Sequence, residues 1–342
     1  MITISLCMIV KNEEKILDRC LSCVADLMDE VIVVDTGSTD RTKEIAAKYT
    51  DKIYDFTWIN DFSAARNYAF SKASGDYIYS ADADEVLDEE NRKRFRILKE
   101  NMYPEIEIVQ MYYCNQLKFG TVYNYDREYR PKLFKRVREF TWIDPIHETV
   151  RTEPLVFDSD IEIVHEQEED HAARDLAAFR RICDEHGFLS ARLLDLYARE
   201  LFIAGGKEDF LQAEAFFEKM AEKEEISAHE LQAAFCVEAK AARFRGEEGK
   251  FYKYAMKAAA CEGCAEICLE LGNYYMEKED YHEAVVWLYN AAFETESILD
   301  IHCAGDKALL AMAECYRRSG FSEQADAYER LAAEWEPERP AG

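Results

Sequence analysis

The stretch EVIVVDTGS (Glu30–Ser38) indicates the fold of the N-terminal half of the chain. A near-continuous run of valine and isoleucine ends in an acid, a small residue and a glycine, which is typical of a buried strand in a parallel sheet. The preceding run ITISLCMIV (Ile2–Val10) resembles a second such strand, and residues between the two runs carry apolar side chains at helical spacing. This order of strand, helix and strand predicts a βαβ unit.

The alternation of helices and strands continues to about residue 85. The predicted elements are a helix in TDRTKEIAAKY (Thr39–Tyr49), a strand in DKIYDF (Asp51–Phe56), a helix in FSAARNYAFSKAS (Phe62–Ser74) and a strand in DYIYSADADE (Asp76–Glu85). Shorter strand-like runs between about Pro104 and His165 surround the basic stretch REYRPKLFKR, and we interpret them as the closing part of the same domain. In such sheets the ligand crevice lies at the carboxyl ends of the strands.

After about Asp170 the sequence is almost wholly helical and contains repeats. Two segments carry residues at the offsets of the tetratricopeptide pattern, which consists of two antiparallel helices. These residues are Leu271, Gly272, Tyr275, Ala284, Leu288 and Ala291 in the first segment, and Leu309, Tyr316, Ala325, Ala332 and Pro337 in the second. Residues 191–220 and 231–260 fit more loosely, and an unspecialised helical bundle is the alternative. The predicted domains are therefore residues 1–170 and 171–342.

Composition limits the classes of partner. The 342 residues carry a net charge of −27, which argues against nucleic acid or an anionic membrane as the main partner. No segment approaches the roughly 20 consecutive apolar residues of a membrane span, and the N-terminus does not resemble a secretory signal, so we expect a cytoplasmic protein. The 11 cysteines, an odd number in a long chain, do not suggest a disulfide framework.

The acids Asp82 and Asp84 follow directly after a predicted strand. Alternate residues of an extended segment point the same way, so both carboxylates can project from the end of that strand. Two hard oxygen ligands suit Mg²⁺ or Mn²⁺, which bind substrate phosphates through one or two protein carboxylates. The alternative is a solvated acidic turn. A second acid, Asp35, at another strand end favours the metal and diphosphate hypothesis.

Several ordered motifs resemble one known family. SLCMIVKNEEKILDRCLSCV, DEVIVVDTGSTDRTKEIA, FSAARNYAFSKASGDYIYSADADE and FTWIDPIHETV together resemble the family 2 glycosyltransferases of the GT-A fold, in particular the branch with tetratricopeptide repeats that includes peptide glycosyltransferases. The resemblance covers residues 1–165 strongly and the repeats more weakly. It implies an α/β, Rossmann-like nucleotide-sugar-binding domain followed by an all-α tetratricopeptide-like domain.

The resemblance also implies a donor site. Val10 would lie against the nucleotide base, Glu13 near the ribose, and Asp35 at the base edge, where it could instead cap the following helix. Arg66 matches a position that contacts the base or phosphates in relatives, although it could form an ordinary surface ion pair. Lys11 replaces the tyrosine common in other members, which leaves the identity of the base open.

The resemblance further assigns metal and diphosphate contacts. Asp82 would contact the ribose or support the metal shell, and Asp84 would bind the metal directly. His165, at the end of the last predicted strand, is our candidate for a further metal contact from the far end of the domain, and a core histidine is the alternative.

An inverting transfer needs a base that removes the acceptor proton. We expect Glu148 to be that base, with His147 orienting or replacing it. Glu148 could instead be a surface acid at a strand end, and Asp144 or Glu85 could serve in its place. The basic stretch either helps to neutralise the diphosphate or forms a basic rim; its members are Arg130, Lys132 and Lys135.

The favoured function is a metal-dependent inverting transferase that uses a UDP-linked sugar. Repeat arrays form grooves that bind peptides, so we expect a peptide or protein acceptor. A saccharide or lipid-linked glycan acceptor is the second hypothesis, and a non-catalytic repeat scaffold is the third. Helical repeats often self-associate, which is compatible with a homodimer.

Overall fold

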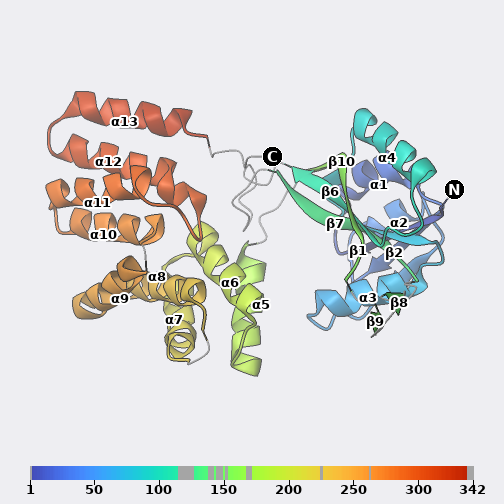
Figure 1. Cartoon of the computed structure of the whole chain (residues 1–342), viewed down its shortest axis with the longest axis horizontal. Coiled ribbons are helices and arrows are strands. Elements are labelled where there is room, and N and C mark those ends of the chain that lie inside the picture. Colours follow the sequence, from blue (N-terminus) through green and yellow to red (C-terminus); the bar gives the residue numbers. More distant parts are fainter. Residues whose placement is uncertain are drawn as a thin grey trace. The chain divides into compact units, whose positions relative to one another are not determined.

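The computed structural model describes residues 2–114, 127–137, 142–143, 149–150, 153–166, 172–223, 226–261 and 263–336. The described residues up to 166 form one compact unit, and those from 172 onward form a second. An α/β unit precedes an all-α unit, so the predicted fold class is confirmed (Figure 1).

The first unit is built on a mixed eight-stranded sheet with the order β3-β2-β1-β4-β7-β6-β10-β5. Its strands are β1 (Ile4–Val10), β2 (Glu30–Asp35), β3 (Ile53–Asp55), β4 (Tyr77–Ala81), β5 (Glu85–Val86), β6 (Ile108–Cys114), β7 (Arg127–Lys135) and β10 (Val156–His165). The strands β1 to β4 are parallel to their neighbours in this group, whereas β7 runs antiparallel to both β4 and β6. A short pair, β8 (Trp142–Ile143) and β9 (Thr149–Val150), lies outside this sheet.

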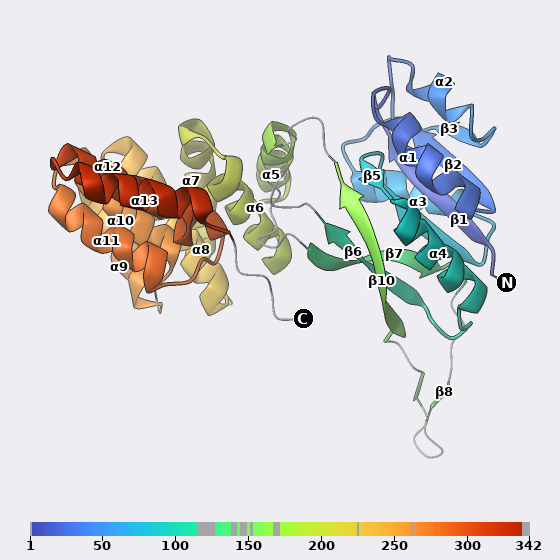
Figure 2. The ribbon, with the colours of Figure 1, turned by 90° about the horizontal axis from the view of Figure 1, so that it is seen from above.

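Helices cover both faces of the sheet (Figure 1). The helices are α1 (Leu17–Val24), α2 (Thr42–Ala46), α3 (Phe62–Lys72) and α4 (Glu89–Asn101), with a 3₁₀ turn η1 (Ala25–Leu27). Alternate residues of β1 point to opposite faces, so that Leu6 packs in the core beneath α1, α2 and α4, and Cys7 packs in the smaller core beneath α3. Figure 2 shows the long strand β10 beside β6, its parallel partner.

The first helix is shorter than its sequence pattern predicts. It begins at Leu17, because the chain after β1 first forms a loop in which Asn12 adopts a φ of 58°. The Asn12 side chain accepts a hydrogen bond from the amide of Thr39 at 2.8 Å, which joins this loop to the one that follows β2.

The second unit is all-helical, and its last six helices pack as three consecutive pairs. The helices are α5 (Ala172–His186), α6 (Ala191–Ala204), α7 (Lys207–Ala221), α8 (Ala228–Arg245), α9 (Glu248–Ala260), α10 (Ala265–Glu277), α11 (Tyr281–Phe293), α12 (Asp306–Arg318) and α13 (Ser322–Glu334), with a 3₁₀ turn η3 (Ile301–Ala304). Gly272 of α10 lies so close to Leu288 of α11 that a Cβ atom there would be 2.5 Å from the leucine side chain. This close approach explains the glycine of the repeat pattern.

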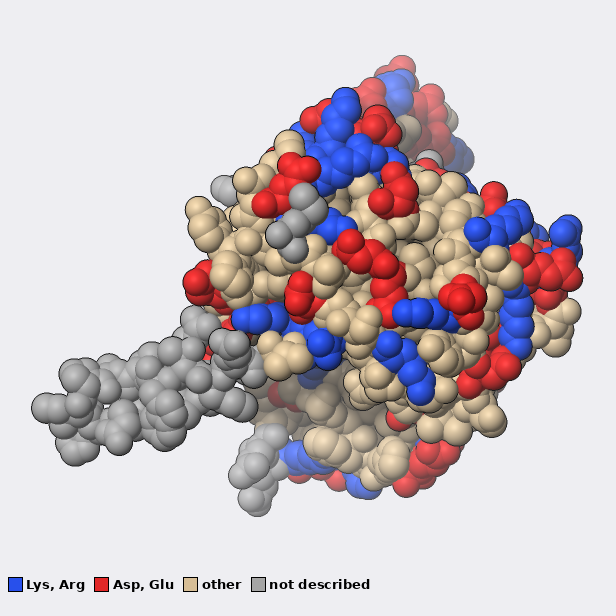
Figure 3. All heavy atoms as spheres, turned by 90° about the vertical axis from the view of Figure 1, so that its right-hand side faces the viewer, with Lys and Arg blue, Asp and Glu red and all other residues tan. Residues whose placement is uncertain are grey.

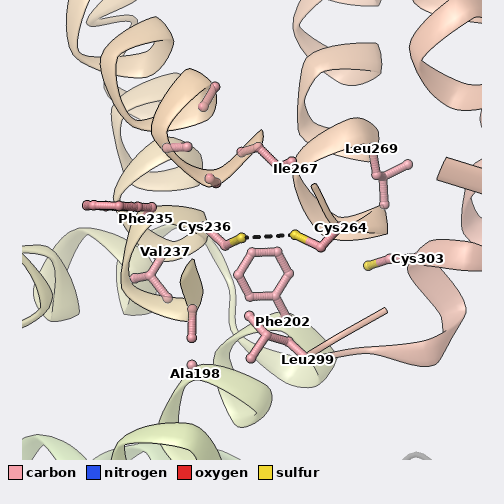
Figure 4. Packing of buried hydrophobic residues seen from close by; sticks show 14 of the residues in the cluster. Ala198, Phe202, Phe235, Cys236, Val237, Cys264, Ile267, Leu269, Leu299 and Cys303 are labelled. Atoms are coloured by element: carbon pink, nitrogen blue, oxygen red, sulfur yellow. Dashed lines mark hydrogen bonds between the residues drawn. The ribbon is translucent and has the colours of Figure 1, made fainter. Parts of the chain in front are cut away.

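One continuous apolar core runs through this unit. Figure 4 shows part of it, where the thiols of Cys236 and Cys264 lie 3.5 Å apart beside Phe202 and Leu299. The cysteines of the chain are free thiols, as the composition predicts.

On the face drawn in Figure 3, acidic and basic side chains lie interspersed among uncharged ones. None of the helices in the described ranges is both long enough and apolar enough to cross a bilayer.

Candidate active site

Three acidic residues follow the buried strand β4 at the carboxyl edge of the sheet. The strand ends at Ala81, and the amide of Glu85 bonds the carbonyl of Asp82 at 3.3 Å, so the acids lie in a turn. Asp82, Asp84 and Glu85 each contact a different partner side chain.

Asp82 pairs with Arg66 from α3. The arginine Nη2 donates to Asp82 Oδ1 at 3.1 Å, and Nη1 donates to the hydroxyl of Ser80 on β4. Burial opposes ionisation of Asp82, but the positive charges of Lys132 and Arg66 outweigh it and hold the pKa of this carboxyl below its usual value. The Asp82 side chain is 43% exposed, so an ionised carboxylate remains accessible at the sheet edge.

Asp84 contacts His165 at the end of β10. Their side chains meet at 2.8 Å between Asp84 Oδ2 and His165 Nε2, and both are largely buried. The amide of Glu166 donates to the Asp84 carbonyl at 2.9 Å, and the Tyr113 ring lies 5.1 Å from the His165 ring. The structure thus brings together two residues, far apart in sequence, that were predicted as metal contacts.

Glu85 forms a buried ion pair with Lys132 of β7, with 2.6 Å between Oε1 and Nζ. Burial raises the pKa of the Glu85 carboxyl to about 7, and the nearby lysine acts in the opposite direction. The three clustered acids therefore have two cationic partners within the protein itself, Arg66 and Lys132.

The residues predicted to hold the nucleoside lie at the same edge, where Val10 of β1 pairs with Asp35 of β2. The Val10 side chain is 3% exposed and the Asp35 side chain is 1% exposed. Asp35 accepts hydrogen bonds from the amides of Gly37 and Ser38 and lies 3.5 Å from Lys43 Nζ. In this geometry Asp35 holds the loop after β2, and its contact with a base edge stays a prediction.

Glu13 lies in the loop between β1 and α1. Its amide donates to the Thr42 hydroxyl at 2.7 Å, and its carbonyl accepts from the amide of Leu17 at 2.9 Å. These bonds fix the backbone near the edge, while the proposed ribose contact stays a prediction. The predicted catalytic residues Glu148 and His147, together with Asp144, lie outside the described residues.

The basic stretch does not act as one group. Lys135 donates to the carbonyl of Pro104 at 2.8 Å, Arg130 pairs with Glu128 at 2.7 Å, and Lys132 is buried. The sequence interpretation did not single out Lys132, yet a signal was present. Pro131 interrupts a strand-like run, and proline inside a sheet marks an edge or a bulge.

The acidic edge of the sheet offers oxygen ligands that suit a divalent ion. Oxygen Oδ1 of Asp84 is buried and receives no hydrogen bond from the described part of the chain. Within the ranges given above, no group of three His, Cys, Asp or Glu side chains is arranged to hold a metal by itself. Mg²⁺ and Mn²⁺ need only one or two carboxylates when a bound phosphate completes the shell, so Asp84 fits such an ion.

Comparison with known proteins defines the class of the first unit. Residues 5–162 match the family model described as Glycosyl transferase family 2. The match covers nearly all of the first unit, which is thus a glycosyltransferase domain by family. The predicted family, family 2, is confirmed for this unit.

Several curated relatives match parts of the chain. A TPR repeat-containing protein of Synechococcus elongatus is 53% identical over 87 residues, which are 25% of this chain and 22% of the relative. The glycosyltransferase SunS of Bacillus subtilis is 41% identical over 92 residues, 26% of this chain and 22% of that protein. An uncharacterized glycosyltransferase of Rickettsia typhi is 29% identical over 174 residues, 47% of this chain and 55% of that protein. Each alignment spans less than two thirds of the relative.

A solved structure of glucosyl-3-phosphoglycerate synthase from Mycobacterium tuberculosis, in complex with Mn²⁺ and uridine-diphosphate-glucose, is also similar. It matches 56% of this chain and 81% of its own chain, with a TM-score of 0.38 and 12% sequence identity.

Proposed function

We propose that the protein is a metal-dependent inverting glycosyltransferase that moves a sugar from a UDP-linked donor to a peptide or protein side chain. The observation that carries the proposal is the buried Asp84 Oδ1, which lacks a hydrogen bond among the described residues, at the acidic edge of a family 2 domain. A buried carboxylate oxygen without a partner is costly unless a ligand satisfies it.

The chain's own residues prepare the donor site. His165 orients Asp84 through the 2.8 Å contact, and Arg66 orients Asp82 while part of its own side chain remains exposed. Asp84 and His165 would hold a divalent ion. When bound, such an ion offsets the negative charge of the departing diphosphate.

The proposed transfer then follows the inverting pattern. The acceptor attacks the anomeric carbon on the face opposite the diphosphate, and a carboxylate accepts the acceptor proton. Glu148, assisted by His147, remains our proposed base. Asp82 is the proposed contact of the ribose or of the metal shell, and Val10, Glu13 and Asp35 the proposed nucleoside contacts.

The helical unit supports a polypeptide acceptor. Its last six helices pack as three consecutive pairs and share one core, an architecture like that of repeat arrays that bind peptides along a groove. A saccharide or lipid-linked glycan needs no such array.

Calorimetric titration of UDP with and without Mn²⁺ tests the donor half of the proposal. We expect Mn²⁺ to strengthen UDP binding, and Asp84→Asn to weaken the Mn²⁺-dependent binding by about 100-fold, since the substitution removes a charged metal ligand. Asp76→Asn, at the opposite end of β4, is the matched control and should bind as the wild type does. Equal Mn²⁺-dependent binding by Asp84→Asn and wild type would remove the metal site from the proposal.

A labelled donor tests the acceptor half. The protein is incubated with a radiolabelled UDP-sugar and a cell extract, which is then divided into acid-precipitated protein and solvent-extracted lipid. We expect label in the protein fraction, and we expect protease digestion to render that label acid-soluble. Label confined to the lipid or to protease-resistant saccharide would refute the peptide acceptor and leave the donor proposal intact.

A further inference from the structure

The strand β7 contains an extra residue beside the acidic turn. Consecutive residues of β6, Val109 and Gln110, pair with Leu133 and Pro131, which leaves Lys132 unpaired between them. This is a β-bulge, a feature that re-aims a side chain and recurs beside active sites. Pro131 has no amide hydrogen to donate, which is tolerated at such a bulge.

The bulge turns the lysine into the interior. Lys132 and Leu133 are adjacent in sequence yet both are buried, so the in-and-out alternation of the strand is broken at this point. The Lys132 ammonium lies 5.8 Å from the ring centre of Tyr79 and 5.7 Å from that of Tyr113. From there it reaches Glu85 Oε1, while Glu85 Oε2 receives no hydrogen bond in the described part of the chain.

The ion pair between Lys132 and Glu85 is buried, which limits what Lys132 can contact. Its side chain is 6% exposed and that of Glu85 is 3% exposed, in contrast to 39% for Arg66. A lysine that is enclosed and held by a carboxylate cannot also reach a diphosphate at the surface of the sheet edge. Lys132 is therefore not a contact of the donor's diphosphate, which was one of the two roles suggested for its basic stretch.

We infer that Lys132 is a positioning residue that acts on Glu85: it fixes and neutralises this third carboxylate so that the donor's diphosphate meets only Asp82 and Asp84. The inference rests on the proposed function and identifies how the site tolerates three adjacent acids.

The net charge of the site depends on the charge of Lys132. With the acids ionised, Asp82, Asp84 and Glu85 against Arg66 and Lys132 give a net charge of −1, which a divalent ion converts to +1. Loss of the lysine charge leaves this group neutral with the ion bound, so an anionic diphosphate is attracted less strongly. The ion itself, being a cation, is not bound less tightly.

A double-mutant cycle tests the inference by calorimetry, with Mn²⁺ alone and with UDP added to Mn²⁺-saturated protein. Lys132→Met should weaken UDP binding on the order of tenfold without weakening Mn²⁺ binding. The double variant Glu85→Gln/Lys132→Met restores the net charge and should bind UDP within about threefold of wild type, as neutral partners replace a buried pair. Glu85→Gln alone should bind UDP at least as tightly as wild type. Lys135→Met, on the same strand but bonded to a surface carbonyl, is the matched control.

The outcomes separate the alternatives. A double variant as weak as Lys132→Met means that the lysine contacts the donor directly, which overturns the inference. Unchanged UDP binding in a folded Lys132→Met variant overturns it as well. If Lys132→Met does not fold, the double variant and Glu85→Gln provide the test instead. Tenfold weaker UDP binding by either of these variants would contradict a role of Lys132 that is limited to neutralising Glu85. Failure of the wild type to bind UDP with Mn²⁺ would instead refute the proposed function.

Discussion

The two ends of the central sheet carry acidic residues in opposite states. At the amino end, Glu30 of β2 is 8% exposed, and both of its oxygens accept hydrogen bonds from Ser5, Ser74 and Lys52. At the carboxyl end, Asp84 keeps one buried oxygen, Oδ1, that has no hydrogen bond among the described residues. Because buried polar groups are normally satisfied, the contrast separates acids that hold the fold from acids that await a ligand.

The largest expected effect concerns the amino end. Burial opposes ionisation of Glu30, but its bonds to Lys52, Ser5 and Ser74 outweigh burial and lower its pKa from 4.5 to about 2. Since one pKa unit corresponds to about 1.4 kcal/mol, Glu30→Gln should lower the free energy of unfolding by about 3 kcal/mol at neutral pH. Urea denaturation followed by circular dichroism measures this difference.

The pH dependence of that loss gives a second check on Glu30. A carboxyl whose pKa is lowered by folding contributes its stability above its unfolded pKa, here 4.5, and loses it as the pH falls toward about 2. The difference between wild type and Glu30→Gln should therefore shrink across this interval. The exposed Glu105→Gln serves as the control and should differ from wild type by less than about 0.5 kcal/mol. If the difference in the free energy of unfolding between wild type and Glu30→Gln stays constant with pH, then the packing of the Glu30 side chain, and not its charge, stabilises the amino end of the sheet.

The order of the elements could be predicted from sequence because each carries its own periodicity. Valine and isoleucine runs predicted the strands β1 and β2, and α3 ends at Lys72, two residues before the predicted end at Ser74. The antiparallel insertion of β7 between β4 and β6 could not be predicted, since it depends on pairing between segments about 50 residues apart, as between Ile78 and Phe134.

The candidate site shows the same limit. Asp82, Asp84 and Arg66 were recognisable from motifs, but the partner of each acid is set by the tertiary fold. His165 reaches Asp84 because β10 pairs with β5, and Lys132 reaches Glu85 because of a bulge that pairing alone defines. Local patterns thus identified the acids, and the cations that balance them became visible only in the assembled sheet.

The smallest expected effect concerns the carboxyl end and tests the comparison most directly. Asp84→Asn removes a charge beside two other acids and leaves a side chain that can still bond His165, so relief of repulsion offsets any loss of contact. In the absence of metal we expect its free energy of unfolding to lie within about 0.5 kcal/mol of wild type. The same urea experiment measures this free energy.

Because Mn²⁺ with UDP stabilises only a protein that binds them, the ligand-induced rise in melting temperature should be present in wild type and absent in Asp84→Asn. A metal-free loss of about 2 kcal/mol or more would show that Asp84, like Glu30, holds the fold, and the distinction between the two ends of the sheet would fail.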